Sequence, residues 1–424
     1  MRERHAPRPH RYARAAGPTA PTASTARVPW PARARAGAHR RGAAVVATVV
    51  GAVLGVACAL PGTAAAEPAA TGGEHRATQE AIDAVVGRGV PGVVAGVSDG
   101  RATWTGQSGT ANLRDGLPRQ ADERFRVGSI TKTFTATVLL QLVAEDRLSL
   151  DDTVHHWLPG LVRGNGHDGE RITVRQLLNH TSGVYSYTDD ADVKRRLFGT
   201  DFLRHRYDTW TPRGIVGIAM THRPYFEPGA GWHYSDTNYV LAAMVIEEVT
   251  GRPYAREVER RVLRPLGLRA TSLPGTDAGM PQPSAHAYSK LTGSLGAPGE
   301  PGSTTYDVTR LNPTLAGAAG EVISSTRDLN RFYRALLSGK LLAPDELREM
   351  TTAVPVAGTK FSYGLGLMKQ RTSCGDVWGH NGAIQGSLST SLVTADGEHA
   401  LSVNVNGDWA GAYDEVVEAE FCAK

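Results

Sequence analysis

The sequence has few cysteines, few lysines and only one long apolar run. Of its 424 residues, three are cysteine and seven are lysine. The composition still includes 41% hydrophobic and 7% aromatic residues, which is enough apolar material for a sizeable core. A disordered or fibrous protein is therefore excluded.

The first 66 residues contain almost no acidic side chains. Ten arginines there stand against Glu3 alone. The rest of the chain has 36 basic and 41 acidic residues, so its net charge is −5 although that of the whole chain is +4. The basic charge belongs to the N-terminal segment, and we expect no nucleic-acid partner for the remainder.

Residues 1–66 are typical of an export leader. Basic residues up to Arg41 precede the uncharged run 43–60, and Ala64-Ala65-Ala66 follows. We expect cleavage after Ala66 and a secreted, monomeric protein without stable membrane insertion. One alternative is a membrane anchor, because the run just reaches spanning length. The other is a lipid anchor on Cys58, although the large apolar residue usually found three positions before such a cysteine is absent.

The two cysteines outside the leader are Cys374 and Cys422. In an oxidising compartment we expect them to form a disulfide. The alternative is a nucleophilic cysteine. A zinc site is poorly supported, because two cysteines without a clustered histidine pair give no closed ligand set, and we expect neither a metal nor an organic cofactor.

Hydrophobic periodicity predicts strands near both ends of the mature chain and helices between them. The predicted strands are 91–97, 101–106, 361–368, 377–379, 386–394 and 400–405. The predicted helices are 74–86, 129–146, 174–178, 237–250, 252–262, 326–337, 343–350 and 413–422. This order predicts an α/β (α+β) fold: an antiparallel sheet domain from residues 67–148 and 321–424, flanked by helices, with a mainly helical domain, 149–320, inserted.

Ser129 and Lys132 are candidates for a nucleophile and its base. Residues three apart on a helix lie on one face, so the two side chains can touch. A lysine can take the proton of a serine hydroxyl when burial lowers the pKa of its amine. Lys132 is the only lysine with a serine three residues before it. Taken alone, the pattern also fits a helix-capping serine beside a solvated lysine.

Two further clusters carry groups suited to acyl transfer. Tyr234 can shuttle a proton to a leaving group, and Asp236 can bind a substrate amide. His380-Asn381-Gly382 precedes a strand-like run, where glycine permits the close approach of a second backbone. Separately, these residues also fit a loop tyrosine beside a capping aspartate and a structural histidine.

Together and in this order, the three clusters resemble the motifs of the serine penicillin-recognising enzymes. That family includes class C β-lactamases, D-alanyl-D-alanine carboxypeptidases and similar esterases. The segments 125–132, 172–183, 319–326 and 363–367 are most similar to the secreted actinobacterial D-alanyl-D-alanine carboxypeptidases. Those enzymes are also similar around Cys374 and Cys422, which supports the disulfide.

The resemblance implies catalytic roles for four residues. Ser129 is acylated, Lys132 accepts its proton, and Tyr234 passes a proton to the leaving amine. His380 stands where many relatives have lysine and is expected to add positive potential. The resemblance also assigns substrate binding to Asp236, Asn381, Gly382 and Ala383, with the oxyanion held between the backbone N–H groups of Ser129 and Ala383.

Some positions depart from the family pattern. Asp236 replaces a frequent asparagine, and Met368, Asn381 and Ala383 stand where the carboxypeptidases hold the substrate carboxylate with an arginine and two threonines. Leu315 replaces an aromatic pocket residue. These changes remove the charge-assisted contacts to a free carboxylate, although Arg371 could substitute. They predict an altered substrate pocket.

The sequence thus predicts a secreted serine hydrolase that works through an acyl-enzyme and resembles D-alanyl-D-alanine carboxypeptidases or β-lactamases. Its expected substrate is a cell-wall D-alanyl peptide, a β-lactam or an ester. An esterase or D-amino-acid peptidase on the same scaffold is one alternative. A non-hydrolytic protein that binds penicillin or cell-wall peptides is the other.

Overall fold

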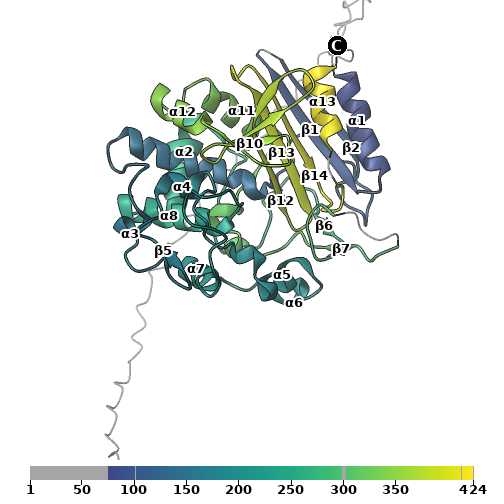
Figure 1. Ribbon diagram of the computed structural model, residues 1–424. Helices are drawn as coiled ribbons and strands as arrows, with labels where there is room; N and C mark the ends of the chain where they lie inside the picture. The colour runs from purple at the N-terminus through teal and green to yellow at the C-terminus, as the bar shows by residue number, and fades with distance from the viewer. Residues whose placement is uncertain (1–74, 101, 298–301, 412, 424) are drawn as a thin grey trace, which may run out of the picture. The chain divides into compact units, whose positions relative to one another are not determined.

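The centre of the fold is an eight-stranded antiparallel sheet. The computed structural model describes residues 75–100, 102–297, 302–411 and 413–423. The strand order is β2-β1-β14-β13-β12-β11-β10-β9 (Figure 1). These strands are β1 (Gly92–Asp99), β2 (Ala102–Gly109), β9 (Val354–Pro355), β10 (Phe361–Tyr363), β11 (Met368–Arg371), β12 (Asp376–Ile384), β13 (Ser387–Thr394) and β14 (His399–Val405).

Both ends of the described chain contribute to this sheet. β1 pairs with β14 in a register that places Val93 opposite Val405 and Val97 opposite Leu401. The valines of β1 are almost fully buried on both faces, as expected for a strand covered on both sides. The predicted fold class, an antiparallel sheet built from both chain ends and flanked by helices, is therefore confirmed.

Helices cover both faces of the sheet. α1 (Arg76–Gly87) and α13 (Asp414–Cys422) pack together, and α1 also contacts β1 and β2 (Figure 1). Ile82 and Val85 of α1 share a buried cluster with Val416 and Val417 of α13. α11 (Thr326–Leu337) contacts β1, β13 and β14 and belongs to the other main core cluster through Leu329.

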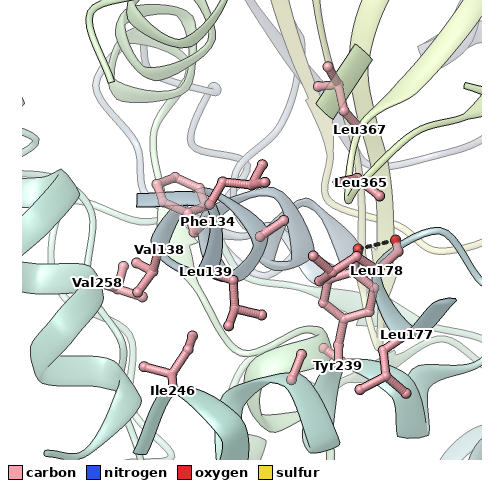
Figure 2. Close-up of a cluster of buried hydrophobic side chains, with 14 of the residues drawn as sticks. Phe134, Val138, Leu139, Leu177, Leu178, Tyr239, Ile246, Val258, Leu365 and Leu367 are labelled. Carbon is pink, nitrogen blue, oxygen red and sulfur yellow. Dashed lines mark hydrogen bonds between the residues drawn. The ribbon is translucent and has the colours of Figure 1, made fainter. Parts of the chain in front are cut away.

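α2 (Thr131–Ala144) is the central helix of that larger core. It has no charged residue beyond Lys132, and apolar or threonine side chains lie on all its sides, so it is enclosed along almost its whole length. Phe134, Val138 and Leu139 face residues of other segments, including Ile246, in Figure 2. This packing fixes the helix whose first turn carries Lys132.

The segment between residues 149 and 320 supplies most of the remaining helices. They are α3 (Val154–Trp157), α4 (Val174–Leu178), α5 (Ala191–Phe198), α6 (Phe202–His205), α7 (Pro212–Met220), α8 (Asp236–Thr250), α9 (Tyr254–Val258) and α10 (Arg264–Leu266). A π-helical turn, Glu259–Leu263, joins the last two. Short ribbons pair β4 (Arg163–Gly164) with β5 (His167–Asp168) and β6 (Tyr288–Ser289) with β7 (Tyr306–Asp307). The division into a sheet domain and a helical domain stays a prediction.

Two strand predictions differ from the structure. The run 361–368 is a hairpin of β10 and β11, because Gly364 and Gly366 interrupt it and Gly366 has a φ of +70°. Predicted strand 377–379 is the first part of β12, which continues through the His380-Asn381-Gly382 cluster. The sequence did not predict the full length of β12, because Gly379 and Gly382 interrupt its strand pattern. The two remaining strands of the described residues, β3 (Phe125–Arg126) and β8 (Ile323–Ser324), pair with each other outside the main sheet. The helix α12 spans Pro344–Thr351.

Several sequence predictions concern residues outside the described part of the chain. The leader 1–66, its apolar run 43–60 and Cys58 all lie there. Among the residues that the structure does describe, none forms a helix with both the length and the apolar character needed to cross a membrane. Cys374 and Cys422 are paired, with their Cα atoms 5.5 Å apart.

Candidate active site

Ser129 and Lys132 lie at the point where a 3₁₀ turn enters α2. Ser129 is in the turn Gly128–Ile130, and Lys132 is in the first turn of the helix. Lys132 Nζ lies 3.0 Å from Ser129 Oγ, 2.7 Å from Asp236 Oδ1 and 2.8 Å from the carbonyl oxygen of Ala319. The predicted contact of the first two side chains is present, and three acceptors fix the direction of the lysine amine.

The Lys132 side chain has no solvent exposure. Burial lowers the pKa of Lys132 below its ordinary value, whereas the Asp236 carboxylate opposes this change. A lysine with a lowered pKa is neutral over a wider pH range and can then accept a proton. The environment therefore suits Lys132 to act as a base toward Ser129.

Tyr234 lines the same hollow as the serine. Its hydroxyl group interacts electrostatically with the Ser129 side chain, and Lys132 Nζ is 4.8 Å from the centre of its ring. Burial and the charge of Asp236 raise the pKa of Tyr234 well above its ordinary value. The phenol thus keeps its proton and can donate it, and a standing phenolate does not fit this environment.

Asp236 is held from both sides at the first residue of α8. Its Oδ2 accepts a hydrogen bond from Thr188 Oγ1 at 3.0 Å, and its backbone N–H donates to Ser186 Oγ at 3.0 Å. Its Oδ1 pairs with Lys132, and 19% of the side chain is exposed. The carboxylate therefore compensates the lysine charge and also lines the hollow beside Ser129.

β12 approaches the serine turn closely at two glycines. A Cβ atom on Gly382 would lie 1.9 Å from the carbonyl oxygen of Val127 and 2.9 Å from the backbone nitrogen of Ser129. A Cβ on Gly128, whose φ is +54°, would lie 2.6 Å from the backbone nitrogen of Ala383. The backbone nitrogens of Ser129 and Ala383, which are predicted to hold the oxyanion, therefore both lie where β12 contacts the serine turn. Ala383 is exposed and lines the hollow at Ser129.

The expectation that His380 adds positive potential is wrong. His380 has no solvent exposure, and burial lowers its pKa to about 3. Its Nε2 accepts a hydrogen bond from the Tyr363 hydroxyl at 2.8 Å, and its Nδ1 donates to the carbonyl oxygen of Asn381 at 2.5 Å. The neutral ring lies 6.5 Å from the Tyr234 ring and lines neither hollow at the serine.

Two hollows meet at Ser129. One, of about 220 Å³, is lined by Asp189, Lys194, Phe198 and Asp236. The other, of about 520 Å³, extends along β12 past Asn381, Gly382 and Ala383 to Phe361 and Tyr413. A substrate can therefore extend in two directions from the serine hydroxyl.

Of the positions that depart from the family pattern, Ala383 lines both hollows and Asn381 lines the second, whereas Met368 and Leu315 line neither. Leu315 is buried, and Arg371, which is 80% exposed, lines neither hollow. Arg371 therefore does not replace the missing arginine. Among the described residues that line the two hollows, Lys194 is the only cation, and its Nζ lies 3.0 Å from Asp189 Oδ1.

Sequence patterns alone did not find Asp189. It follows no motif, and it reaches the site only because the turn Tyr187–Asp189 packs against the start of α8. One sequence pattern, in contrast, resembles a catalytic motif but lies outside the site. Gly96 to Gly100 has the form Gly-x-Ser-x-Gly of other serine hydrolases, but Ser98 lies on β1, is buried and accepts a hydrogen bond from Arg334 Nη1 at 2.6 Å.

No group of three or more histidine, cysteine, aspartate or glutamate residues that could hold a metal ion occurs in the described ranges. What the site offers is a serine hydroxyl, a buried amine, a protonated phenol and two backbone N–H groups within one small volume. This set of groups is able to form and hydrolyse an acyl-enzyme without a metal.

The fold and this site define a serine hydrolase. The chain matches the Beta-lactamase family over residues 76–414 and belongs to that family.

Individual relatives add detail. The chain is 58% identical to a D-stereospecific amidohydrolase from Streptomyces sp., over 82% of this chain and 99% of that one, with a TM-score of 0.77. It is 31% identical to the D-amino acid amidase of Ochrobactrum anthropi SV3 complexed with D-phenylalanine, over 81% and 98% of the two chains, with a TM-score of 0.69. Penicillin-binding protein 4* of Bacillus subtilis is 26% identical over 336 residues, which are 77% of this chain and 70% of that protein.

Proposed function

We propose that the protein hydrolyses the amide bond that follows a D-amino acid residue with a free amino group. Ser129 attacks the carbonyl carbon while neutral Lys132 takes the hydroxyl proton. The backbone N–H groups of Ser129 and Ala383 hold the oxyanion. As the C–N bond breaks, the Tyr234 phenol donates a proton to the leaving amine and regains one from the Lys132 ammonium, so that both groups return to their starting states. Water then hydrolyses the ester on Ser129 and releases the D-amino acid.

The observation that carries this proposal is the 58% identity with the D-stereospecific amidohydrolase over 99% of its chain. The charges of the site give the physical reason. With Lys132 neutral in the active form, the hollow beside Ser129 has two carboxylates, Asp189 and Asp236, against one ammonium group, that of Lys194, which pairs with Asp189. This net negative charge favours a substrate ammonium group over a substrate carboxylate. A β-lactam or a D-alanyl-D-alanine peptide brings a carboxylate, and we expect both to be poor substrates.

The experiment compares matched substrates on the purified protein. We expect kcat/KM for D-phenylalanine p-nitroanilide to exceed that for the L-enantiomer and for N-acetyl-D-phenylalanine p-nitroanilide by at least about tenfold each, which is roughly 1.4 kcal/mol. In Asp189→Asn, the preference for the free amine should shrink. Equal rates with both enantiomers, or efficient release of D-alanine from a D-alanyl-D-alanine peptide, would overturn the proposal.

The pH dependence tests the role of Lys132 as a base. Since the neutral amine is the active form, kcat/KM should rise as pH increases through the pKa of Lys132. Asp236 raises that pKa, although burial has the larger, lowering effect. We therefore expect the acidic limb of the pH profile of Asp236→Asn to lie at lower pH than in the wild type. An acidic limb that stays in place would show that another group controls it.

We also propose that the protein is exported and that Cys374 and Cys422 form a disulfide there. The pairing of the two cysteines supports this, as does the leader-like sequence of residues 1–66. The two residues are 48 positions apart, and a cross-link over such a loop stabilises by about 2 to 4 kcal/mol. Cys374→Ser/Cys422→Ser should lose that much unfolding free energy in urea titrations, and reduction of the wild type should reproduce the loss. Unchanged stability in both would contradict the disulfide.

A further inference from the structure

The segment directly after α4 packs against Tyr234 through His180. His180 has no solvent exposure there and has a backbone φ of +64°. This left-handed conformation is uncommon for residues other than glycine. None of the catalytic and binding roles proposed above uses His180, although it lies within the segment 172–183 that resembles the family.

His180 makes hydrogen bonds to the residues on both sides of Tyr234. Its carbonyl oxygen accepts the backbone N–H of His233 at 3.1 Å, and its Nδ1 accepts the backbone N–H of Ser235 at 3.2 Å. Its imidazole ring lies 4.3 Å from the Tyr234 ring, centre to centre. One residue therefore contacts the tyrosine ring and also fixes the backbone before and after it.

The hydrogen bonds define the protonation of the ring. A backbone N–H can only donate, so Nδ1 of His180 carries no proton. The Asn238 amide nitrogen also lies 3.2 Å from this Nδ1, and its oxygen accepts a hydrogen bond from Ser182 Oγ at 2.7 Å. Burial, followed by the charge of Lys132, holds the pKa of His180 well below its ordinary value. The ring is thus neutral, with its proton on Nε2.

This arrangement has an energetic cost. Nε2 of His180 is buried and has no hydrogen-bond partner among the described residues, and leaving a buried donor unpaired is unfavourable. The rings of Tyr239 and Tyr363, at 5.4 Å and 4.7 Å, enclose the imidazole further. Unpaired polar groups and unusual backbone conformations of this kind are concentrated at functional sites.

We propose that His180 is a positioning residue that holds Tyr234 in place for proton transfer at Ser129. The inference rests on the role proposed above for Tyr234. The phenol oxygen must come within hydrogen-bond distance of the reacting groups at Ser129, and a displacement of about 1 Å is enough to lower a rate about 100-fold. His180 contacts no reacting atom and lines neither hollow at Ser129, so we expect its effect on kcat and not on substrate affinity.

The test compares His180→Gly with His180→Asn. Both residues tolerate a positive φ, but only asparagine returns an acceptor near the position of Nδ1. We expect kcat for a D-amino acid p-nitroanilide to fall about 30- to 100-fold in His180→Gly, with KM within about threefold. His180→Asn should recover at least about tenfold of that loss.

Two further variants separate positioning from stability and from chemistry. His167 is another buried histidine whose ring accepts a backbone N–H, from Tyr185 to Nε2 at 3.3 Å. His167→Ala should lower the melting temperature and leave kcat unchanged. Tyr234→Phe should lose kcat by at least as much as His180→Gly; wild-type kcat in Tyr234→Phe would remove the proposed role of Tyr234 and, with it, the basis of this inference.

With Tyr234→Phe inactive, the outcomes for His180 are decisive. Wild-type kcat in His180→Gly, or equal kcat in the glycine and asparagine variants, would overturn the positioning role. The positioning role would also be overturned if the loss of kcat per degree of lost melting temperature were the same in His167→Ala as in His180→Gly. If His180→Gly does not fold, His180→Gln replaces it, because glutamine carries its acceptor one bond further out. The order of kcat should then be His180→Asn above His180→Gln.

Discussion

Replacing Lys132 by methionine is expected to lower kcat/KM about 1,000-fold, within the range found for loss of a general base. Methionine fills the same narrow, unbranched space in the buried first turn of α2. It cannot take the proton from Ser129 Oγ, which lies 3.0 Å from the lysine amine. Steady-state kinetics with a D-amino acid p-nitroanilide provide the measurement.

The same substitution also affects stability, and a double variant separates the two effects. Lys132→Met leaves the Asp236 carboxylate without its partner at 2.7 Å, which we expect to cost up to about 3 kcal/mol. In Lys132→Met/Asp236→Asn no unpaired charge remains, so the unfolding free energy should return toward that of the wild type. Activity should not return with it. If the double variant regained activity, Lys132 would have a structural role only.

Replacing Gly382 by alanine is expected to lower kcat about 100- to 1,000-fold. The added Cβ would lie 1.9 Å from the Val127 carbonyl oxygen, so β12 and the serine turn must move apart. The backbone nitrogens of Ser129 and Ala383 then no longer face one oxyanion. Loss of one such donor costs about 2.7 to 4 kcal/mol of transition-state stabilisation in enzymes where it is measured.

Gly96 offers a matched control for this prediction. It lies on β1 of the same sheet, and an added Cβ would lie 2.7 Å from Thr326 Oγ1, which is a side-chain atom. Gly96→Ala should lower the melting temperature with kcat unchanged. Gly382→Ala should lower kcat even if its melting temperature is the same as that of Gly96→Ala. A wild-type kcat in Gly382→Ala would place the oxyanion elsewhere.

Much of the fold could be predicted from local sequence. The predicted helix 326–337 has the bounds of α11, and its buried residues include Leu329, Phe332 and Leu336 at helical spacing. The predicted strands 91–97 and 101–106 correspond to β1 and β2, which pair with each other. In contrast, α3, α5, α6, α7 and α10, none of which is longer than nine residues, were not predicted.

The site also contains residues that could be predicted from local sequence and residues that could not. Lys132 could be predicted because its spacing from Ser129 makes the contact local, and a motif marks it. Asp189 and His180 could not, since their relation to the serine depends on how distant turns pack, and no local spacing records that. The charge of His380 was predicted wrongly for a similar reason. The sequence shows a titratable ring, and only the structure shows that the ring is buried beside Tyr363.

The most direct test of the central claim, an acyl-enzyme on Ser129, is mass spectrometry of the protein quenched in acid during turnover of a D-phenylalanine ester. The wild type should gain the mass of one D-phenylalanyl group, and peptide mapping should place it on Ser129. Ser129→Ala should show neither the adduct nor turnover. An adduct on another residue, or turnover that persists in Ser129→Ala, would contradict the account.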